Sequence, residues 1–331
     1  MADTVRLHTS RSHGWRTALF AAVVLAGLVA VVLHLGDLER FAEMARQAEP
    51  FWLLAGFAFQ FATYAFLALG WQAVLRRAGS PQPLRRLLPI ALCKLFVDQV
   101  VPAAGMGGNV LLVDRLTVLG VPRGTAVSTL LVSILGYYAA YAVLALAMMV
   151  ALWLHHAATA LVVGPVTAFL LVALAIPSLY LWAWKRGAGP LPRSLERFPP
   201  LARLVAIVSQ APPEVVGDRP LIARVALWNG LIVIADAATL AVCLHALGGP
   251  LLPMTAFIAV MAAAIAVTLA PLPLGLGSFE ATCTATLAML GVPVAAALAA
   301  TLLLRMLTLW LPLLPGLWLM RRAGHRGRKR R

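Results

Sequence analysis

Two short stretches that combine Pro, Gly and polar residues interrupt the apolar sequence of this chain. The first runs from Pro102 to Asn109 (Pro-Ala-Ala-Gly-Met-Gly-Gly-Asn), and the second runs from Pro273 to Glu280 (Pro-Leu-Gly-Leu-Gly-Ser-Phe-Glu). A Gly-Val-Pro triplet follows each stretch at the same distance along the chain. In a membrane protein, paired interruptions at matching positions are the best sequence indication of a transport site.

The chemistry of these stretches follows from where helices can begin after them. Apolar segments over 108–120 and 279–291 start at the interruptions, so their first backbone N–H groups have no partner within the helix and carry partial positive charge. Such helix ends bind phosphate, and a phospholipid head group fits that geometry. The alternative is that Gly and Pro only permit tight packing or end helices. The residues of the two stretches that we predict to line a transport site are Pro102, Gly105, Gly107, Gly108, Asn109, Pro273, Gly275, Gly277 and Glu280.

Glu280 and Arg305 are charged residues within apolar surroundings. A charge at the centre of a bilayer costs about 2.5–3.5 kcal/mol by insertion scales, so each should face a cavity or a partner. Glu280 could cap the helix that begins beside it, pair with Arg305 or carry a proton, and the first of these needs no role in transport. Arg305 lies too deep in the segment 294–320 to reach the membrane surface easily, so we expect it to contact a carboxylate or a lipid phosphate.

Other charged residues lie close to the first interruption. Lys94 and Asp98 precede it at i, i+4 and could form a salt bridge on a helix surface. Asn109 is the positional counterpart of Glu280. The charged residues that we add here to the predicted transport site are Lys94, Asp98, Asp114 and Arg115.

Asp236 interrupts the apolar segment 221–247. It could pair with Arg224 or with Arg305, or it could bind a proton linked to transport. Because an acid within the membrane indicates a functional site, we add Asp236 to the predicted transport site.

No set of residues typical of an enzyme is present. The sequence holds no Ser/His/Asp arrangement, phosphate-binding loop or metal-ligand spacing, and the Gly-rich residues 105–108 lack the setting that a dinucleotide-binding motif requires. Cys93, Cys243 and Cys283 lie in apolar segments, and we expect them to be buried apolar residues. We therefore predict a protein that is not an enzyme and that has no metal site and no cofactor.

Two alternatives to transport stay open. One is a membrane-embedded lipid-modifying enzyme that uses Asp98, Asp114 or Glu280, or the non-catalytic accessory subunit of such an enzyme. The other is a structural or regulatory membrane protein in which the interrupted segments are packing devices.

The elements that position these residues are apolar helices. Apolar residues make up 62% of the 331-residue chain and charged residues 12%, against about 45–50% and about 25% in ordinary soluble domains. The apolar surface must therefore face lipid, and a helix needs about 20 apolar residues to cross a bilayer. The segments long enough are 17–35, 50–75, 124–154, 157–184, 221–247 and 294–320. The shorter, interrupted segments are 87–101, 108–120, 253–271 and 279–291.

The net charge of +15 is concentrated in a few segments. These are the N-terminus, 76–86, 185–224 and 321–331. Basic residues gathered in this way indicate the cytoplasmic side of a membrane, and they also attract anionic lipid head groups. We therefore predict membrane lipids with anionic head groups as partners and no nucleic-acid partner, and we place both termini in the cytoplasm.

This orientation constrains the interrupted segments. Segment 87–120 begins and ends on the cytoplasmic side, and segment 253–291 begins and ends on the outer side. Each is either two crossings or a re-entrant hairpin of two half-helices, and the short half-segments favour hairpins. Backbone that stops being helical at membrane depth must be covered by protein or water, so we expect the two interruptions to meet around a wet cavity near the midplane.

We accordingly predict an all-α, polytopic integral membrane protein with about six full transmembrane helices and two re-entrant hairpins in inverted repeats. The chain, 1–331, is expected to form a single membrane domain whose first helix is not cleaved. Its parts are a first half over 17–184, a basic cytoplasmic linker over 185–220, a second half over 221–320 and a basic cytoplasmic tail over 321–331.

The two interrupted stretches, each followed by Gly-Val-Pro and a long apolar segment, resemble the flippase-like membrane domain of lysylphosphatidylglycerol synthases and its stand-alone relatives. The resemblance covers about residues 15–320, and the stretch with Gly275, Gly277 and Glu280 is the more specific part. It implies a protein of the bacterial inner membrane that moves a lipid head group between leaflets. Synthase activity is not implied, because the separate domain that performs it is not expected here. Some stand-alone relatives are linked to hopanoid or polyprenyl-linked lipids, so the resemblance leaves these and phospholipids open as substrates.

The sequence departs from the family pattern in its first half. The family commonly has an acid where Asn109 stands, and an acid–Arg pair near Ser133 and Ile134. The first half-site would therefore be electrically neutral, which argues against a symmetric mechanism. In the expected mechanism the half-helix N-termini hold the phosphate, Arg305 aids binding, and Glu280 gates the site or carries a proton.

Overall fold

The computed structural model describes residues 49–100, 106–154, 160–186, 210–269 and 277–310. All regular structure in these ranges is helical, as the composition predicts. The expected first span, 17–35, the tail, 321–331, and most of the linker, 185–220, lie outside the described residues.

Among the described residues, four helices are long and apolar enough to cross a membrane. They are α3 (Pro50–Arg77), α6 (Arg123–Leu154), α7 (Ala160–Arg186) and α11 (Arg219–Ala246). They coincide closely with four of the predicted spans, so the prediction of an all-α, multi-pass membrane protein is confirmed at these positions. Large apolar side chains such as Leu54, Leu146 and Leu171 are exposed on them, as a lipid-facing surface requires.

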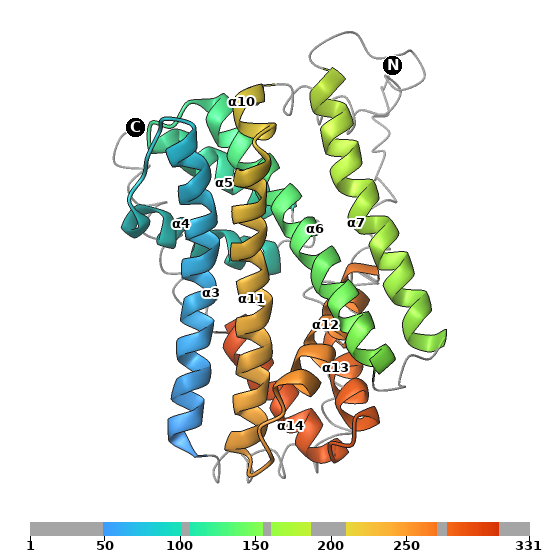
Figure 1. The fold of residues 1–331 in the computed structure, drawn as a ribbon. Helices are drawn as coiled ribbons and strands as arrows, with labels where there is room; N and C mark the ends of the chain where they lie inside the picture. Colours follow the sequence, from blue (N-terminus) through green and yellow to red (C-terminus); the bar gives the residue numbers. More distant parts are fainter. Residues whose placement is uncertain (1–48, 101–105, 155–159, 187–209, 270–276, 311–331) are drawn as a thin grey trace, which may run out of the picture. The chain divides into compact units, whose positions relative to one another are not determined.

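The helices α3 and α11 pack against each other as an antiparallel pair (Figure 1). At one end the N–H of Glu49 donates to the carbonyl of Ala246 at 3.1 Å. At the other end Arg77 forms an ion pair with Asp218 at 2.6 Å. Asp218 also starts α11, because its carboxylate accepts a hydrogen bond from the N–H of Leu221 as a helix N-cap. Polar contacts therefore join this pair of helices at both ends.

Two pairs of shorter helices complete the bundle. Helix α4 (Leu84–Val100) packs against α5 (Met106–Val118), and α12 (Pro253–Leu269) packs against α13 (Ser278–Met289). These helices have 12 to 17 residues and are about 18–26 Å long, less than the roughly 30 Å of a hydrocarbon core. They occupy the segments predicted as hairpins, 87–120 and 253–291. The interruptions between the helices, 101–105 and 270–276, lie outside the described residues.

One helix of each short pair packs against α6, α5 near its start and α12 near its end. Near the start of α6, Ala126 belongs to a buried cluster that contains Trp71 of α3 and residues of α4 and α5. Near the end of α6, Met148 and Leu152 belong to another cluster, with residues of α7, α11 and α12. Within the described ranges the helices of the two pairs make no extensive contact with each other. The predicted meeting of the interruptions falls on residues outside these ranges.

The two Gly-Val-Pro triplets form turns of the same geometry. Gly120 and Gly291 have φ values of 84° and 91°, a conformation that Gly adopts without steric cost. The valine after each Gly donates its N–H to a carbonyl in the last turn of the preceding helix, that of Leu116 at 3.1 Å in the first turn and that of Leu287 at 3.0 Å in the second. This is the Schellman arrangement that ends a helix. The first turn leads into α6 and the second into α14 (Val294–Arg305).

Two short elements remain among the described residues. A single helical turn, α10 (Pro213–Val216), precedes α11. Helix α14 continues as a π-helical turn, η2 (Met306–Trp310). The expected span over 294–320 is therefore described only as far as residue 310.

Candidate functional site

Glu280 forms two short polar contacts at the start of α13. One carboxylate oxygen accepts a hydrogen bond from Arg305 Nε at 2.7 Å, and the other accepts one from the N–H of Gly277 at 2.7 Å. The Arg305 guanidinium also lies over the ring of Phe279, 4.8 Å from its centroid. The side chains of Arg305 and Glu280 are 13% and 17% exposed, so the ion pair between them is largely shielded, whereas the contact with Gly277 is exposed. Of the roles considered for Glu280, capping and pairing with Arg305 are thus combined in one arrangement.

Asp98 makes the corresponding contacts at the start of α5. One of its carboxylate oxygens pairs with Lys94 Nζ at 2.6 Å, as the spacing of the two residues predicts. The other accepts a hydrogen bond from the N–H of Gly108 at 3.0 Å. A Cβ atom added to Gly108 would collide with the Asp98 carboxylate. The structure therefore explains why Gly stands at this position.

In both pairs of short helices, a carboxylate connects a basic side chain to a backbone N–H at the start of the second helix. At least one N–H of each helix end is therefore satisfied within the protein. A lipid phosphate at these sites would use the remaining N–H groups, or would displace the carboxylate from Lys94 or from Arg305. Hydrogen bonds between charged groups are about twice as strong as neutral ones, so such an exchange replaces one strong contact with another.

A cavity of about 430 Å³ lies beside the first pair of short helices. It brings together three predicted site residues, Lys94, Asp98 and Asn109. Ser133 and Ile134 also line it; near these positions the family that the sequence resembles commonly has an acid–Arg pair, which this sequence lacks. The other lining residues are Leu67, Trp71, Leu112, Leu130, Tyr137, Tyr138 and Asn229. Sequence reasoning missed the polar members of this list.

Asp236 lines a second, smaller cavity of about 170 Å³, which shares Leu67 with the first. Its carboxylate accepts a hydrogen bond from Gln60 Nε2 at 2.9 Å. Among the described residues, no basic side chain lies within ion-pair distance of Asp236. The pairings with Arg224 and Arg305 considered from the sequence are therefore not formed. The other residues that line this cavity are Thr63, Tyr64, Leu95, Ile232 and Thr308.

The remaining predicted site residues fall into three groups. Asp114 is exposed on α5, and neither Asp114 nor Arg115 lines either of the two cavities. The residues that lie outside the described ranges are Pro102, Gly105, Pro273 and Gly275. Gly107 lies in the first turn of α5, and Gly277, with φ of 83°, is the N-cap of α13.

The residues described above occur in a sequence that matches one protein family over most of its length. A comparison with the curated proteins gives no match. The sequence model of the family described as the lysylphosphatidylglycerol synthase TM region matches residues 18–316. That match includes all four described spans and both pairs of short helices. The chain therefore belongs to the lysylphosphatidylglycerol synthase TM region family.

Proposed function

We propose that this protein moves a lipid with an anionic head group between the leaflets of the bacterial inner membrane. The substrate class is a phospholipid or a polyprenyl- or hopanoid-type lipid. The observation that carries the proposal is the cavity in which Lys94, Asp98 and Asn109 meet at the start of the short helix α5. Membership of a family of membrane domains named after a lipid synthase is consistent with a lipid substrate.

The size and lining of this cavity suit a head group. A volume of about 430 Å³ lies within the usual range of about 300–1,000 Å³ for small-molecule sites. It is too small for two acyl chains as well, which therefore remain in the bilayer while the head group crosses. Lys94 supplies the positive charge for a phosphate, and Asn109 supplies an amide that can donate or accept hydrogen bonds.

The proposal includes re-entrant hairpins in inverted repeats. The short helices α4 and α5 pack near the end of α3 that carries Arg77, and the basic segment 76–86 indicates that this end is cytoplasmic. Helix α12, which packs against α13, lies near the other end of α6. Entry of the two hairpins from opposite faces is supported by this placement, by the short helices and by the two turns of equal geometry.

Two further acidic residues have roles in the proposed mechanism. Arg305 exchanges Glu280 for the lipid phosphate, so that Glu280 acts as a gate. Asp236 binds a proton during transport, because its carboxylate lies in the interior of a membrane-spanning helix beside a neutral amide. Among the described residues, titratable groups that interact with it electrostatically are Tyr64 of α3, which lines the same cavity, and Tyr141 of α6.

The test is reconstitution into vesicles that contain a labelled lipid, with the accessibility of the label measured in each leaflet. The wild-type protein should redistribute an anionic lipid faster than protein-free vesicles do. The double variant Lys94→Met/Asp98→Asn removes both charges of the cavity without leaving one unpaired, and it should lose this activity. Lys185→Met, at the exposed end of α7, is the matched control and should retain it.

The same vesicles distinguish transport from the enzymatic alternative. Mass spectrometry of the recovered lipid should show an unchanged mass after redistribution. No redistribution of any phospholipid or polyprenyl phosphate, or a lipid of changed mass, would overturn the proposal.

A further inference from the structure

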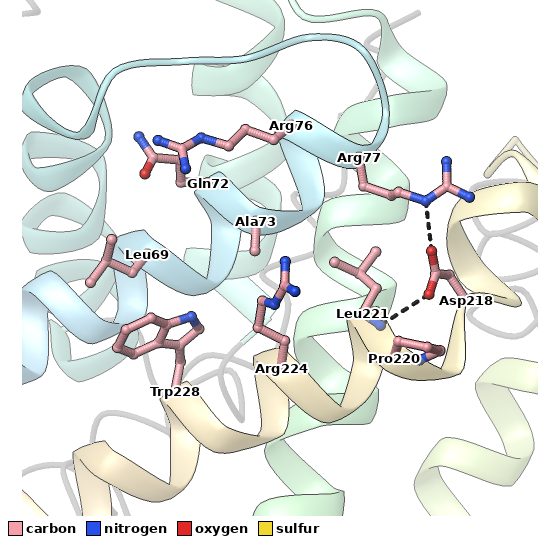
Figure 2. A pocket seen from close by; sticks show the side chains of 10 residues that line it. All are labelled: Leu69, Gln72, Ala73, Arg76, Arg77, Asp218, Pro220, Leu221, Arg224 and Trp228. Atoms are coloured by element: carbon pink, nitrogen blue, oxygen red, sulfur yellow. Dashed lines mark hydrogen bonds and ion pairs between the residues drawn. The ribbon is translucent and has the colours of Figure 1, made fainter.

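A groove between the last turns of α3 and the first turns of α11 is separate from both cavities described above. It has a volume of about 470 Å³ and shares no lining residue with either of them. Figure 2 shows that its lining side chains come from both helices, with three arginines, Arg76, Arg77 and Arg224, at the end where α3 stops and α11 starts.

The charges of the groove are not balanced. Asp218 is the acidic residue among those that line it, and it is occupied by Arg77 Nε at 2.6 Å and by the N–H of Leu221 at 3.0 Å. Within the described part of the chain, no carboxylate lies within ion-pair distance of Arg76 or Arg224. The groove therefore carries two guanidinium groups available for an anion, and their planar donors suit the oxygens of a phosphate.

The part of the groove farther from the end of α3 is apolar. Arg224 is followed one helical turn later by Trp228, and Arg76 is preceded on α3 by Leu69, so basic residues give way to apolar ones in the same direction along both helices. Figure 2 shows the Arg76 side chain extending back along α3, with its guanidinium beside Gln72. Phe66 stacks against Trp228, with 5.7 Å between ring centroids, and continues this wall along the helices. Tryptophan is enriched where a membrane meets water. A soluble anion would contact only the basic end, whereas a lipid matches the whole length.

We infer that this groove binds an anionic phospholipid of the leaflet next to Arg76 and Arg224, with its phosphate held by these two arginines. The first carbons of its chains lie along Leu69 and Trp228, and the rest of each chain extends into the bilayer. The lipid is a resident one that joins the ends of α3 and α11, and the inference does not depend on the proposed transport. The ion pair between Arg77 and Asp218 closes the polar end of the groove and keeps Asp218 away from the phosphate.

Thermal unfolding in detergent tests the inference directly. Phosphatidylglycerol should raise the unfolding temperature of the wild-type protein more than phosphatidylcholine or inorganic phosphate does. Arg76→Gln/Arg224→Gln should weaken the apparent affinity for phosphatidylglycerol roughly 30-fold, from the loss of two basic residues near the membrane surface. Arg85→Gln/Arg86→Gln removes the same charge from exposed positions at the start of α4 and should leave the affinity unchanged.

Quenching of tryptophan fluorescence reports the position of the bound lipid and not the stability of the protein. Brominated phosphatidylglycerol should quench tryptophan fluorescence of the wild-type protein more than that of Trp228→Phe, and this difference should vanish in Arg76→Gln/Arg224→Gln. Equal effects of inorganic phosphate and phosphatidylglycerol would overturn the assignment to a lipid. Equal affinity in the two double-arginine variants, or quenching independent of Trp228, would overturn the site itself.

Discussion

The contact between Gly108 and Asp98 predicts an unusual response to a single added methyl group. In Gly108→Ala the new Cβ would lie 2.6 Å from Asp98 Cγ, far inside van der Waals contact. The Asp98 side chain is short, so it can avoid this contact only by turning away. It would then lose the hydrogen bond from the N–H of residue 108 and its ion pair with Lys94.

The expected change in the free energy of unfolding of Gly108→Ala is the sum of three contributions. Replacement of Gly by Ala within a helix favours the folded state by about 1 kcal/mol. The loss of a hydrogen bond to a charged group costs about 1.5–3 kcal/mol, and the partly exposed pair with Lys94 contributes about 0.2–1 kcal/mol. The balance is a loss of about 1–3 kcal/mol, which corresponds to a fall of several degrees in the unfolding temperature.

Thermal unfolding of the purified protein in detergent is the assay, and Gly230→Ala in α11 is the matched control. Among the described residues, no atom beyond the neighbouring backbone of α11 lies within 4 Å of a Cβ at residue 230, so this variant should be as stable as the wild type or slightly more stable. In an Asp98→Ala background, Gly108→Ala should no longer destabilise the protein, because the carboxylate that it meets is absent. If Gly108→Ala is as stable as Gly230→Ala, the assigned role of Asp98 is wrong.

Three other predictions follow from the same structure. Glu280→Gln removes the carboxylate that pairs with the largely shielded Arg305 and should lower the free energy of unfolding by about 1.5–3 kcal/mol, the contribution of a hydrogen bond to a charged group; lipid movement at the wild-type rate in reconstituted vesicles would refute the gating role of Glu280. Asp236→Asn removes a charge that has a neutral partner, so the unfolding temperature should stay the same or rise. Any acceleration of lipid movement by a pH gradient should be lost in this variant. If a pH gradient accelerates lipid movement as much as in the wild type, the proton-binding role is contradicted. The N–H of Leu221, and then the Arg77 guanidinium, hold the pKa of Asp218 below its usual value. The stabilising contribution of Asp218 is therefore complete above the ordinary Asp pKa of about 3.9 and is lost as pH falls through the lowered pKa. The difference in unfolding temperature between wild type and Asp218→Asn should shrink as pH is lowered from 6 to 3, and a constant difference would exclude this linkage.

Hydropathy was sufficient to predict the four described spans, because a bilayer requires long apolar helices and leaves few alternatives. The Gly and Pro residues marked where the short helices are interrupted, since both residues disrupt regular helices. The contact between Glu280 and Arg305 was among the predicted alternatives, because a charge in apolar surroundings must find a partner. The pairing of Lys94 with Asp98 followed from their helical spacing alone.

Two features that depend on how the helices pack against one another were not predicted from the sequence. The hydrogen bond from the Gly108 N–H to Asp98 requires α5 to fold back against α4, which helical spacing within α4 does not indicate. The inward positions of Gln60 and Asn229 were missed because α3 and α11 are apolar around most of their circumference. A polar amide within an apolar span was the signal that could have found both residues.

The arrangement of α13 and α14 has a mechanical consequence. The backbone turn at Gly291 joins the end of α13 to the start of α14, and the contact between Glu280 and Arg305 joins their other ends. The two helices thus form a closed loop with one covalent and one ionic junction. If an anion displaced Glu280, the ionic junction alone would open, because the backbone turn and the packing of α14 against α11 and α13 would still hold the two helices together.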